Sequence, residues 1–232
     1  MNDLHGFGFV VPHWAYWGWL TLMPLLMMYM IKREAAKCIP PPKALDEELA
    51  LDVLAEEDPV LKVQGNRFTK LIDKISDFTG IFIALWTVNA VVAYFYEVVM
   101  RYIFNMPTIW VHEASFLLFG MQYLMTGAYA LLHGAHVRVD VLYVRLPERG
   151  RVGMDIFTSV FFFIFAMALI GTSWGFFVSS FEMGETTIET WGIQYWPVKL
   201  LMFSGAVLLT LAGLSKLIKD IMLFRAMGEA SR

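Results

Sequence analysis

The 232-residue chain is short of charge and of cysteine. Asp, Glu, Lys and Arg make up 17% of it, whereas soluble domains carry roughly a quarter. The single cysteine, Cys38, allows no internal disulfide. The sequence also lacks a Gly-x-Ser-x-Gly elbow, a His-Glu-x-x-His pair, a Walker loop and a dinucleotide fingerprint. These absences argue against an enzyme, and we expect no nucleic-acid partner.

Long apolar runs are what the chain has instead. Hydrophobic residues account for 58% of it, and apolar stretches lie near residues 14–31, 78–100, 114–132, 156–181 and 193–214. Each stretch approaches the roughly 20 residues that a helix needs to cross a hydrocarbon core of about 30 Å. Because backbone groups in lipid must be hydrogen-bonded within their own segment, such stretches become helices. The sequence therefore predicts an all-α integral membrane protein with five transmembrane helices.

Basic residues are scarce in alternate connections. They are nearly absent from residues 1–13, 101–113 and 182–192, and frequent in 32–74, 133–152 and the C-terminal tail. Positively charged connections mark the cytoplasmic side of a membrane protein. We therefore expect the N-terminus outside and the C-terminus in the cytoplasm. Tryptophans, which concentrate at membrane interfaces, fall near the predicted outer ends, and Trp86 is the exception.

These patterns divide the chain into four parts: an N-terminal anchor helix (1–32), an acidic, proline-containing cytoplasmic connector (33–66), a four-span domain (67–225) and a cytoplasmic tail (226–232). Within the four-span domain, residues 67–77 carry apolar side chains at the i, i+3, i+4, i+7 spacing of a helix, namely Phe68, Leu71, Ile72 and Ile75. We expect an amphipathic interfacial helix there, with its lysines near phospholipid headgroups. A cytoplasmic continuation of the second span is the alternative.

One predicted span has a polar face. The residues that share this face are Ser115, Gln122, Thr126, Tyr129 and His133. Such a face turns away from lipid and towards other helices, where it can form hydrogen bonds.

Small residues and one charged pair also follow helical spacings. Gly171, Gly175 and Ser179 form a small-xxx-small series, which lets another helix backbone approach closely. Glu97 precedes Arg101 by four residues, the favourable order for an ion pair on one helix. We expect the first to be a packing surface and the second an interfacial salt bridge.

The segment HGAHVRVD (133–140) has the composition of a metal site. A site built from His133, His136 and Asp140 would need one continuous helix, and Gly134 is the residue type found just past a helix end. No further carboxylate or cysteine lies nearby to complete a tetrahedral shell. We therefore expect the span to end near His133 and the segment to mark a membrane boundary.

Two passages resemble a known family. "RYIFNMP", with the following "IW" and "HE", and then "GAYALLHGAHVRVDVLYVRLPER" resemble the small permease subunit of tripartite ATP-independent periplasmic (TRAP) transporters, the DctQ-like family, over roughly residues 67–222. The resemblance implies four spans with both ends cytoplasmic, here preceded by an additional N-terminal transmembrane helix. It places Arg101, Asn105, Pro107, Trp110 and Glu113 in the family's outer turn. His112 stands where family members often carry a second acid.

The resemblance implies a non-catalytic scaffold in a bacterial inner-membrane complex that imports organic acids with a sodium gradient. Its partners would be a large elevator-type permease subunit, which would hold the substrate and sodium sites, and a periplasmic binding protein. No cofactor is expected in this chain itself. The additional helix would pack either on the large subunit or on its own chain.

Residue roles follow from the resemblance and the packing patterns together. The residues expected to be structural or to contact another subunit are Arg101, Asn105, Trp110, Glu113, Gln122, Thr126, Tyr129, His136, Arg138, Asp140, Gly171 and Gly175. Arg138 and Asp140 are expected to pair and fix the cytoplasmic turn. Those expected to help dock the binding protein are Glu182, Glu185 and Glu189.

Two other classes of protein stay open. A membrane-anchor subunit of a redox complex would hold quinone or a surface haem, the latter on His13 and His112 at the predicted outer side. A free-standing carrier would need a midplane ionisable residue or a broken helix. Near the predicted midplane the spans offer only Asn89 and Gln122, and Pro24 is the one mid-span proline.

Overall fold

The computed structural model describes residues 10–35, 65–135, 146–189 and 191–230. In this part of the chain the helices are α1 (His13–Ala35), α3 (Arg67–Ala84), α4 (Trp86–Tyr102), α5 (Val111–Leu132), α7 (Glu148–Met183) and α8 (Trp196–Ala230). The only other regular feature there is an isolated antiparallel bridge between Thr186 and Gln194. The predicted all-α fold is confirmed.

Four helical segments are long and apolar enough to cross a membrane. They cover Arg67–Tyr102, Val111–Leu132, Arg149–Met183 and Trp196–Gly228. Helix α1 has 23 residues, about 34 Å at 1.5 Å per residue, but it is not among these candidate spans. Its first half mixes His, Tyr, Gly and three Trp with the apolar residues. The four-span core is thus present, and a transmembrane α1 stays a prediction.

Residues 67–77 do not form a helix of their own. They begin α3, which continues to Ala84 and passes through Leu85, itself in right-handed helical conformation, into α4. This matches the alternative of a continuation of the second span. The buried face of α3 is Thr69, Ile72, Ser76, Gly80 and Ile83. Small and polar residues thus face the neighbouring helices, while the larger apolar side chains Phe68, Leu71 and Ile75 are exposed.

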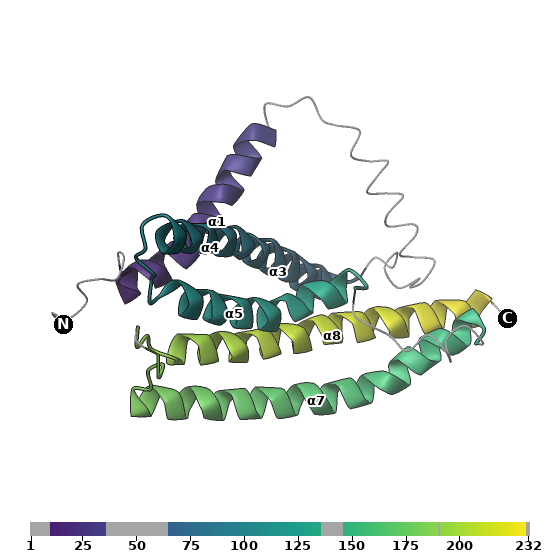
Figure 1. The fold of residues 1–232 in the computed structure, drawn as a ribbon. Coiled ribbons are helices and arrows are strands. Elements are labelled where there is room, and N and C mark those ends of the chain that lie inside the picture. Colours follow the sequence, from purple (N-terminus) through teal and green to yellow (C-terminus); the bar gives the residue numbers. More distant parts are fainter. Residues whose placement is uncertain (1–9, 36–64, 136–145, 190, 231–232) are drawn as a thin grey trace.

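The helices stack in the order α7, α8, α5 and then α3 with α4, as Figure 1 shows. Glycines permit the closest approaches. A Cβ at Gly205 of α8 would lie 2.6 Å from the backbone oxygen of Leu124 in α5, and one at Gly213 would lie 2.2 Å from the Phe162 ring of α7. Because neither neighbour leaves room for a methyl group, these glycines set the spacing between the helices.

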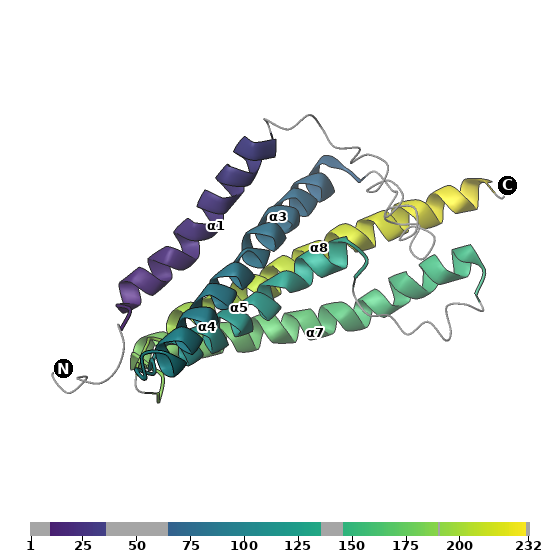
Figure 2. The ribbon, with the colours of Figure 1, turned by 45° about the horizontal axis from the view of Figure 1, so that its top comes forward.

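Helix α1 packs on its own chain. Tyr16 and Leu20 are buried in one hydrophobic cluster with Ile83, Trp86 and other residues of α3, α4 and α5. Most of the second half of α1 is exposed, and it diverges from α3 and α4 (Figure 1). We call the end of the bundle where α1 begins the Trp191 end. The opposite end, where α8 finishes, we call the Asp73 end (Figure 2).

Candidate functional site

An aromatic cluster joins the elements that meet at the Trp191 end. The Trp191 indole N–H donates to the Val11 carbonyl at 3.0 Å, and His13 Nε2 lies 3.0 Å from the Trp191 carbonyl oxygen. The rings of Tyr16 and Trp110 pack on Trp191 with centroids 5.2 and 6.2 Å away. The connection between α7 and α8 therefore holds the start of α1 against α5.

Two further hydrogen bonds tie α1 to α4. Trp19 Nε1 donates to Asn89 Oδ1 at 2.8 Å, and Trp86 Nε1 donates to the Leu20 carbonyl at 2.8 Å. Pro24 has no N–H to give to the carbonyl four residues before it, which is that of Leu20. Trp86 supplies the missing donor. No sequence pattern indicated this role for Trp86, because the role depends on which helix lies beside α1.

A buried carboxylate closes the turn between α4 and α5. Glu97 accepts hydrogen bonds from Arg101 and from both the backbone N–H, at 3.0 Å, and the hydroxyl of Thr108. Asn105 within this turn has φ 55°, a left-handed conformation that Asn tolerates better than most residues. The expected Glu97–Arg101 ion pair is present. The hydrogen bonds from Thr108 to Glu97 were not predicted. Helical spacing within α4 does not show which residue of the following turn comes back to Glu97.

Glu113 and Trp110 lie where the turn enters α5. Glu113 is buried in the first turn of the helix, where a negative charge is favoured. Neither of its carboxylate oxygens has a hydrogen-bond partner among the described residues. The Trp110 ring packs 6.2 Å from that of Tyr96. His112 is exposed.

The polar face of α5 lies against α3 and α4. Gln122 Nε2 donates to the Thr87 hydroxyl at 2.7 Å. The Tyr129 ring fills the space that a Cβ at Gly80 would need, with ring atoms 2.1 Å from that position. Thr126 donates to the Gln122 carbonyl of its own helix at 2.7 Å. This face is thus taken up largely by contacts within the chain.

The end of α5 has the form that Gly134 predicted. Gly134 has φ 66°, and the Ala135 N–H donates to the Ala130 carbonyl at 2.9 Å, as in a Schellman motif. His133 follows the last helical residue and lies 3.4 Å from an Asp77 carboxylate oxygen. The predicted site residues His136, Arg138 and Asp140 lie outside the described residues.

The small-residue series on α7 packs against none of the described residues of the chain. A Cβ at Gly171 or Gly175 would meet nothing within 4 Å, and Ser179 is exposed as well. The close approaches between helices of the described bundle occur at Gly80, Gly205 and Gly213 instead. The packing surface predicted from these residue types stays a prediction, because another subunit would have to cover it.

The three glutamates expected to face the binding protein differ in their surroundings. Lys199 forms an ion pair with Glu185, and this hydrogen bond holds the pKa of the Glu185 carboxyl below its ordinary value. Glu182 and Glu189 are exposed, and Ile188 beside Glu189 is fully exposed. Glu185 is therefore held within the connection, while the other two project from it.

At the Asp73 end, a charged link joins α3 to α8. Lys219 donates to Asp73 at 2.7 Å, and the Ser215 hydroxyl donates to the same carboxylate at 2.8 Å. Helix spacing around Asp73 could not show this link, because the partner residues follow about 140 residues later in the chain.

No catalytic arrangement emerges from these contacts. Among the residues that the structure describes, no group of three His, Cys, Asp or Glu side chains is placed to hold a metal ion. Fold and contacts together define a polytopic α-helical membrane protein whose polar side chains tie its own helices together.

The chain matches the model of a known protein family. A model of the family described as tripartite ATP-independent periplasmic transporters, DctQ component, matches residues 90–222, more than half of the chain. The chain belongs to this family of transporter components. No curated protein matches the chain. Helices α1 and α3 precede the matched region.

Proposed function

We propose that the chain is the non-catalytic small membrane subunit of a sodium-coupled TRAP transporter that imports organic acids. It scaffolds a large elevator-type permease subunit, which holds the substrate and sodium sites, and it works with a periplasmic binding protein. Family membership and the four-span core support this proposal. Side-chain hydrogen bonds that join one helix of the described bundle to another, such as those of Gln122 with Thr87 and of Lys219 with Asp73, suit a scaffold.

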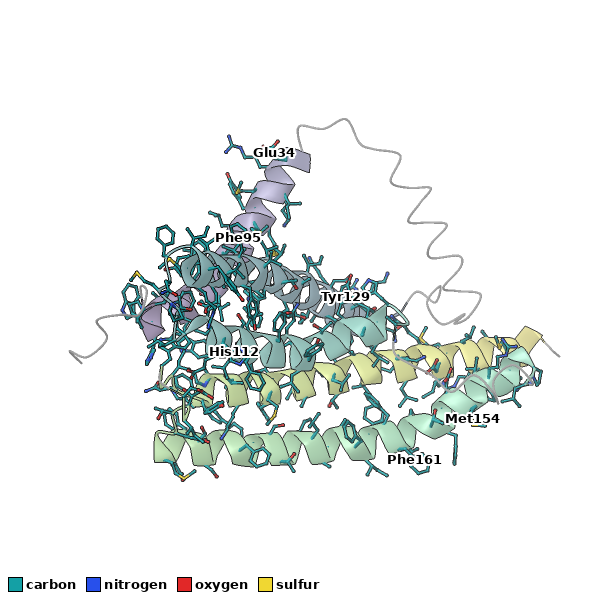
Figure 3. The ribbon with its side chains drawn as sticks, viewed as in Figure 1. Glu34, Phe95, His112, Tyr129, Met154 and Phe161 are labelled. Carbon is teal, nitrogen blue, oxygen red and sulfur yellow. The ribbon has the colours of Figure 1, made fainter. Side chains whose placement is uncertain are left out.

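The open face of α7 is the observation that carries the proposal. Ile164, Ala168, Gly171 and Gly175 follow one another at intervals of 4, 3 and 4 residues, and all are exposed. Phe161, also exposed, lies on the side of α7 away from α8 (Figure 3). A stripe of small residues beside large aromatic ones suits close packing by a helix of another subunit. Lipid tails need no such stripe.

The proposed topology has the Trp191 end in the periplasm and the Asp73 end in the cytoplasm of a bacterial inner membrane. Helix α1 begins and α8 finishes at opposite ends of the bundle (Figure 1), as an odd number of passes requires. Lys32, Arg33 and Lys216 lie towards the Asp73 end, which fits the positive-inside rule.

The connection between α7 and α8 is the proposed contact with the binding protein. The connection exposes Ile188 and Glu189, and Glu182 is exposed in the last turn of α7 just before it. His136, Arg138 and Asp140 are assigned to the cytoplasmic turn and its subunit contact. Replacing Arg138 or Asp140 by alanine should lower assembly or transport rate without changing substrate preference, and a changed preference would count against the scaffold role.

Co-purification tests the proposal directly. The chain is tagged at its C-terminus, extracted gently from native membranes, and analysed for stoichiometric partners. We expect a very hydrophobic subunit with about a dozen predicted spans. Gly171→Leu and Gly175→Leu should reduce its recovery at least about tenfold, because a leucine would separate the packed helices.

Gly18→Leu is the matched control. It also adds a leucine where a Cβ would meet nothing within 4 Å, but on α1, outside the family match. Its partner recovery should equal that of the wild type. A chain that is recovered alone, or with a haem-containing subunit, would contradict the proposed function and favour the redox-anchor alternative.

A further inference from the structure

An exposed stripe on α5 lies on the face of the bundle opposite α1. It consists of Phe116, Gly120 and Tyr123, which share one side of the helix. Ala114, whose carbonyl accepts a hydrogen bond from Tyr16 of α1, precedes Tyr123 by nine residues. At about 100° per residue, this separation places the two side chains half a turn apart around the helix. We call the stripe the Tyr123 face.

Tyr123 presents a phenol to the middle of the membrane. Its side chain is 80% exposed, and it forms no hydrogen bond with any described residue. Because α5 runs from Val111 to Leu132, Tyr123 lies about 18 Å from the first and about 14 Å from the second, at 1.5 Å per residue. Its hydroxyl group cannot reach either interface, where tyrosines of membrane proteins concentrate. Lipid tails offer this O–H group no acceptor.

A second hydroxyl lies at the same level of the bundle. Gln122 donates to Thr87 Oγ1 at 2.7 Å, and Thr87 is exposed on α4. The Thr87 oxygen is the acceptor in this contact, and its own O–H donates to no described residue. Gln122 directly precedes Tyr123, so the two unpaired donors lie at similar depth. Because hydroxyl donors are costly to leave unpaired in hydrocarbon, acyl chains alone do not satisfy this surface.

Gly120 favours a helix as the group that covers these donors. A Cβ at Gly120 would meet nothing within 4 Å, so a second backbone can approach α5 closely between Phe116 and Tyr123. A helix is the element that keeps its own backbone hydrogen-bonded in lipid. The missing acceptors are then side-chain oxygens of Ser, Thr, Asn or Gln on that helix. The chain belongs to a family of transporter components, which favours another component over a second copy.

We propose that a transmembrane helix of the large permease subunit packs across Gly120 and accepts hydrogen bonds from Tyr123 and Thr87. This contact, which rests on the proposed function, adds to the one on the open face of α7. The two contacts differ in chemistry. The stripe on α7 is built of small and apolar side chains, whereas the Tyr123 face requires acceptor oxygens near the centre of the membrane.

Photocrosslinking in native membranes tests where the large subunit lies. The photoreactive residue p-benzoyl-phenylalanine is introduced separately at Phe116, at Phe161 of α7 and at Val92. Val92 lines the cavity between α1, α4 and α5 and is 62% exposed, so it reports on the opposite face. We expect a crosslink to the large subunit from Phe116 and Phe161, and no product above background from Val92.

The other outcomes separate this inference from the proposed function. A product from Phe161 alone would overturn the inference and leave the proposed function standing. No product from either phenylalanine position would contradict both. A product from Phe116 with twice the mass of the chain would identify a second copy as the occupant and overturn the inference.

Removal of one hydroxyl tests the hydrogen bond itself. Tyr123→Phe keeps the ring and should lower recovery of the large subunit, per amount of the chain, about three- to fifteenfold, the range of one interhelical hydrogen bond. Tyr102→Phe is the matched control, because Tyr102 is 79% exposed at the end of α4, where water reaches its hydroxyl. Its recovery should equal that of the wild type. Equal recovery with Tyr123→Phe and Tyr102→Phe would show that no acceptor faces Tyr123, and the proposal would be wrong.

Discussion

The bond from Trp86 to the Leu20 carbonyl makes a sharp prediction about stability. Trp86→Phe keeps an aromatic ring in the buried site but removes the indole N–H. In membrane proteins one such bond is worth about 0.6 kcal/mol on average and up to about 1.7 kcal/mol. Leaving a buried acceptor without a donor costs about 1–3 kcal/mol. We therefore expect Trp86→Phe to destabilise the chain by about 1–2 kcal/mol.

Pro24 provides the means to test the cause. Pro24→Ala restores an N–H four residues after Leu20, so the helix can satisfy that carbonyl itself. In the Pro24→Ala background, Trp86→Phe should cost about 1 kcal/mol less than it does in the wild type. The four proteins form a double-mutant cycle. Their free energies of unfolding can be measured by SDS titration in mixed micelles, followed by circular dichroism.

Non-additivity is the decisive result of this cycle. Independent substitutions add within about 0.3–0.5 kcal/mol, so a coupling energy near 1 kcal/mol would identify the shared carbonyl. If Trp86→Phe costs the same in both backgrounds, Trp86 stabilises the fold only by packing, and the reasoning about the proline is wrong.

Three other predictions concern the ends and the middle of the bundle. Thr108→Val should lower the free energy of unfolding by about 1–2 kcal/mol, because it removes a hydroxyl donor from the buried Glu97 carboxylate of α4. Thr108→Ser keeps the hydroxyl and should lower it by less than half as much. Equal losses for the two variants would contradict this. Because Lys199 lowers the pKa of Glu185 below 4.5, the pair stabilises the fold above that pH, and this contribution is lost as the pH falls through the lowered pKa. Glu185→Gln should therefore flatten the stability profile on the acidic side of the ordinary glutamate pKa, by less than about 1 kcal/mol since solvent screens the pair, and an unchanged slope would refute the assignment. Gly205→Ala should lower the free energy of unfolding by more than about 2 kcal/mol, because its methyl group would collide with the backbone of Leu124 in α5. Gly171→Ala should stay within about 0.5 kcal/mol of the wild type. Similar melting temperatures for the two variants would show that α5 and α8 can separate.

Much of the fold could be predicted from local patterns. Apolar length alone located the four-span core, since a helix must satisfy its own backbone in lipid. Gly134 located the end of α5, because glycine adopts the left-handed conformation without a Cβ penalty. The spacing of Glu97 and Arg101 predicted their ion pair. Each of these features depends on a few neighbouring residues.

Pairwise contacts over long sequence separations could not be predicted in this way. The partners of Asp73 and Trp86 lie on helices about 140 and 66 residues away, so helix spacing carried no sign of them. The same limit applied to the glycines. Gly171 and Gly175 had the pattern for close packing, yet among the described residues Gly80, Gly205 and Gly213 are glycines that lie close against other helices.

The sequence by itself determined that the chain is an all-helical membrane protein, where its core spans lie and which transporter family it resembles. Those properties follow from hydrophobicity, helix length and short motifs, which are local. Three features became visible only in the packed bundle: α1 packs on its own chain, Trp86 satisfies the carbonyl freed by Pro24, and a cavity separates α1 from α4 and α5. These depend on how helices are arranged in space, and helix packing is set by side chains that meet from distant parts of the chain.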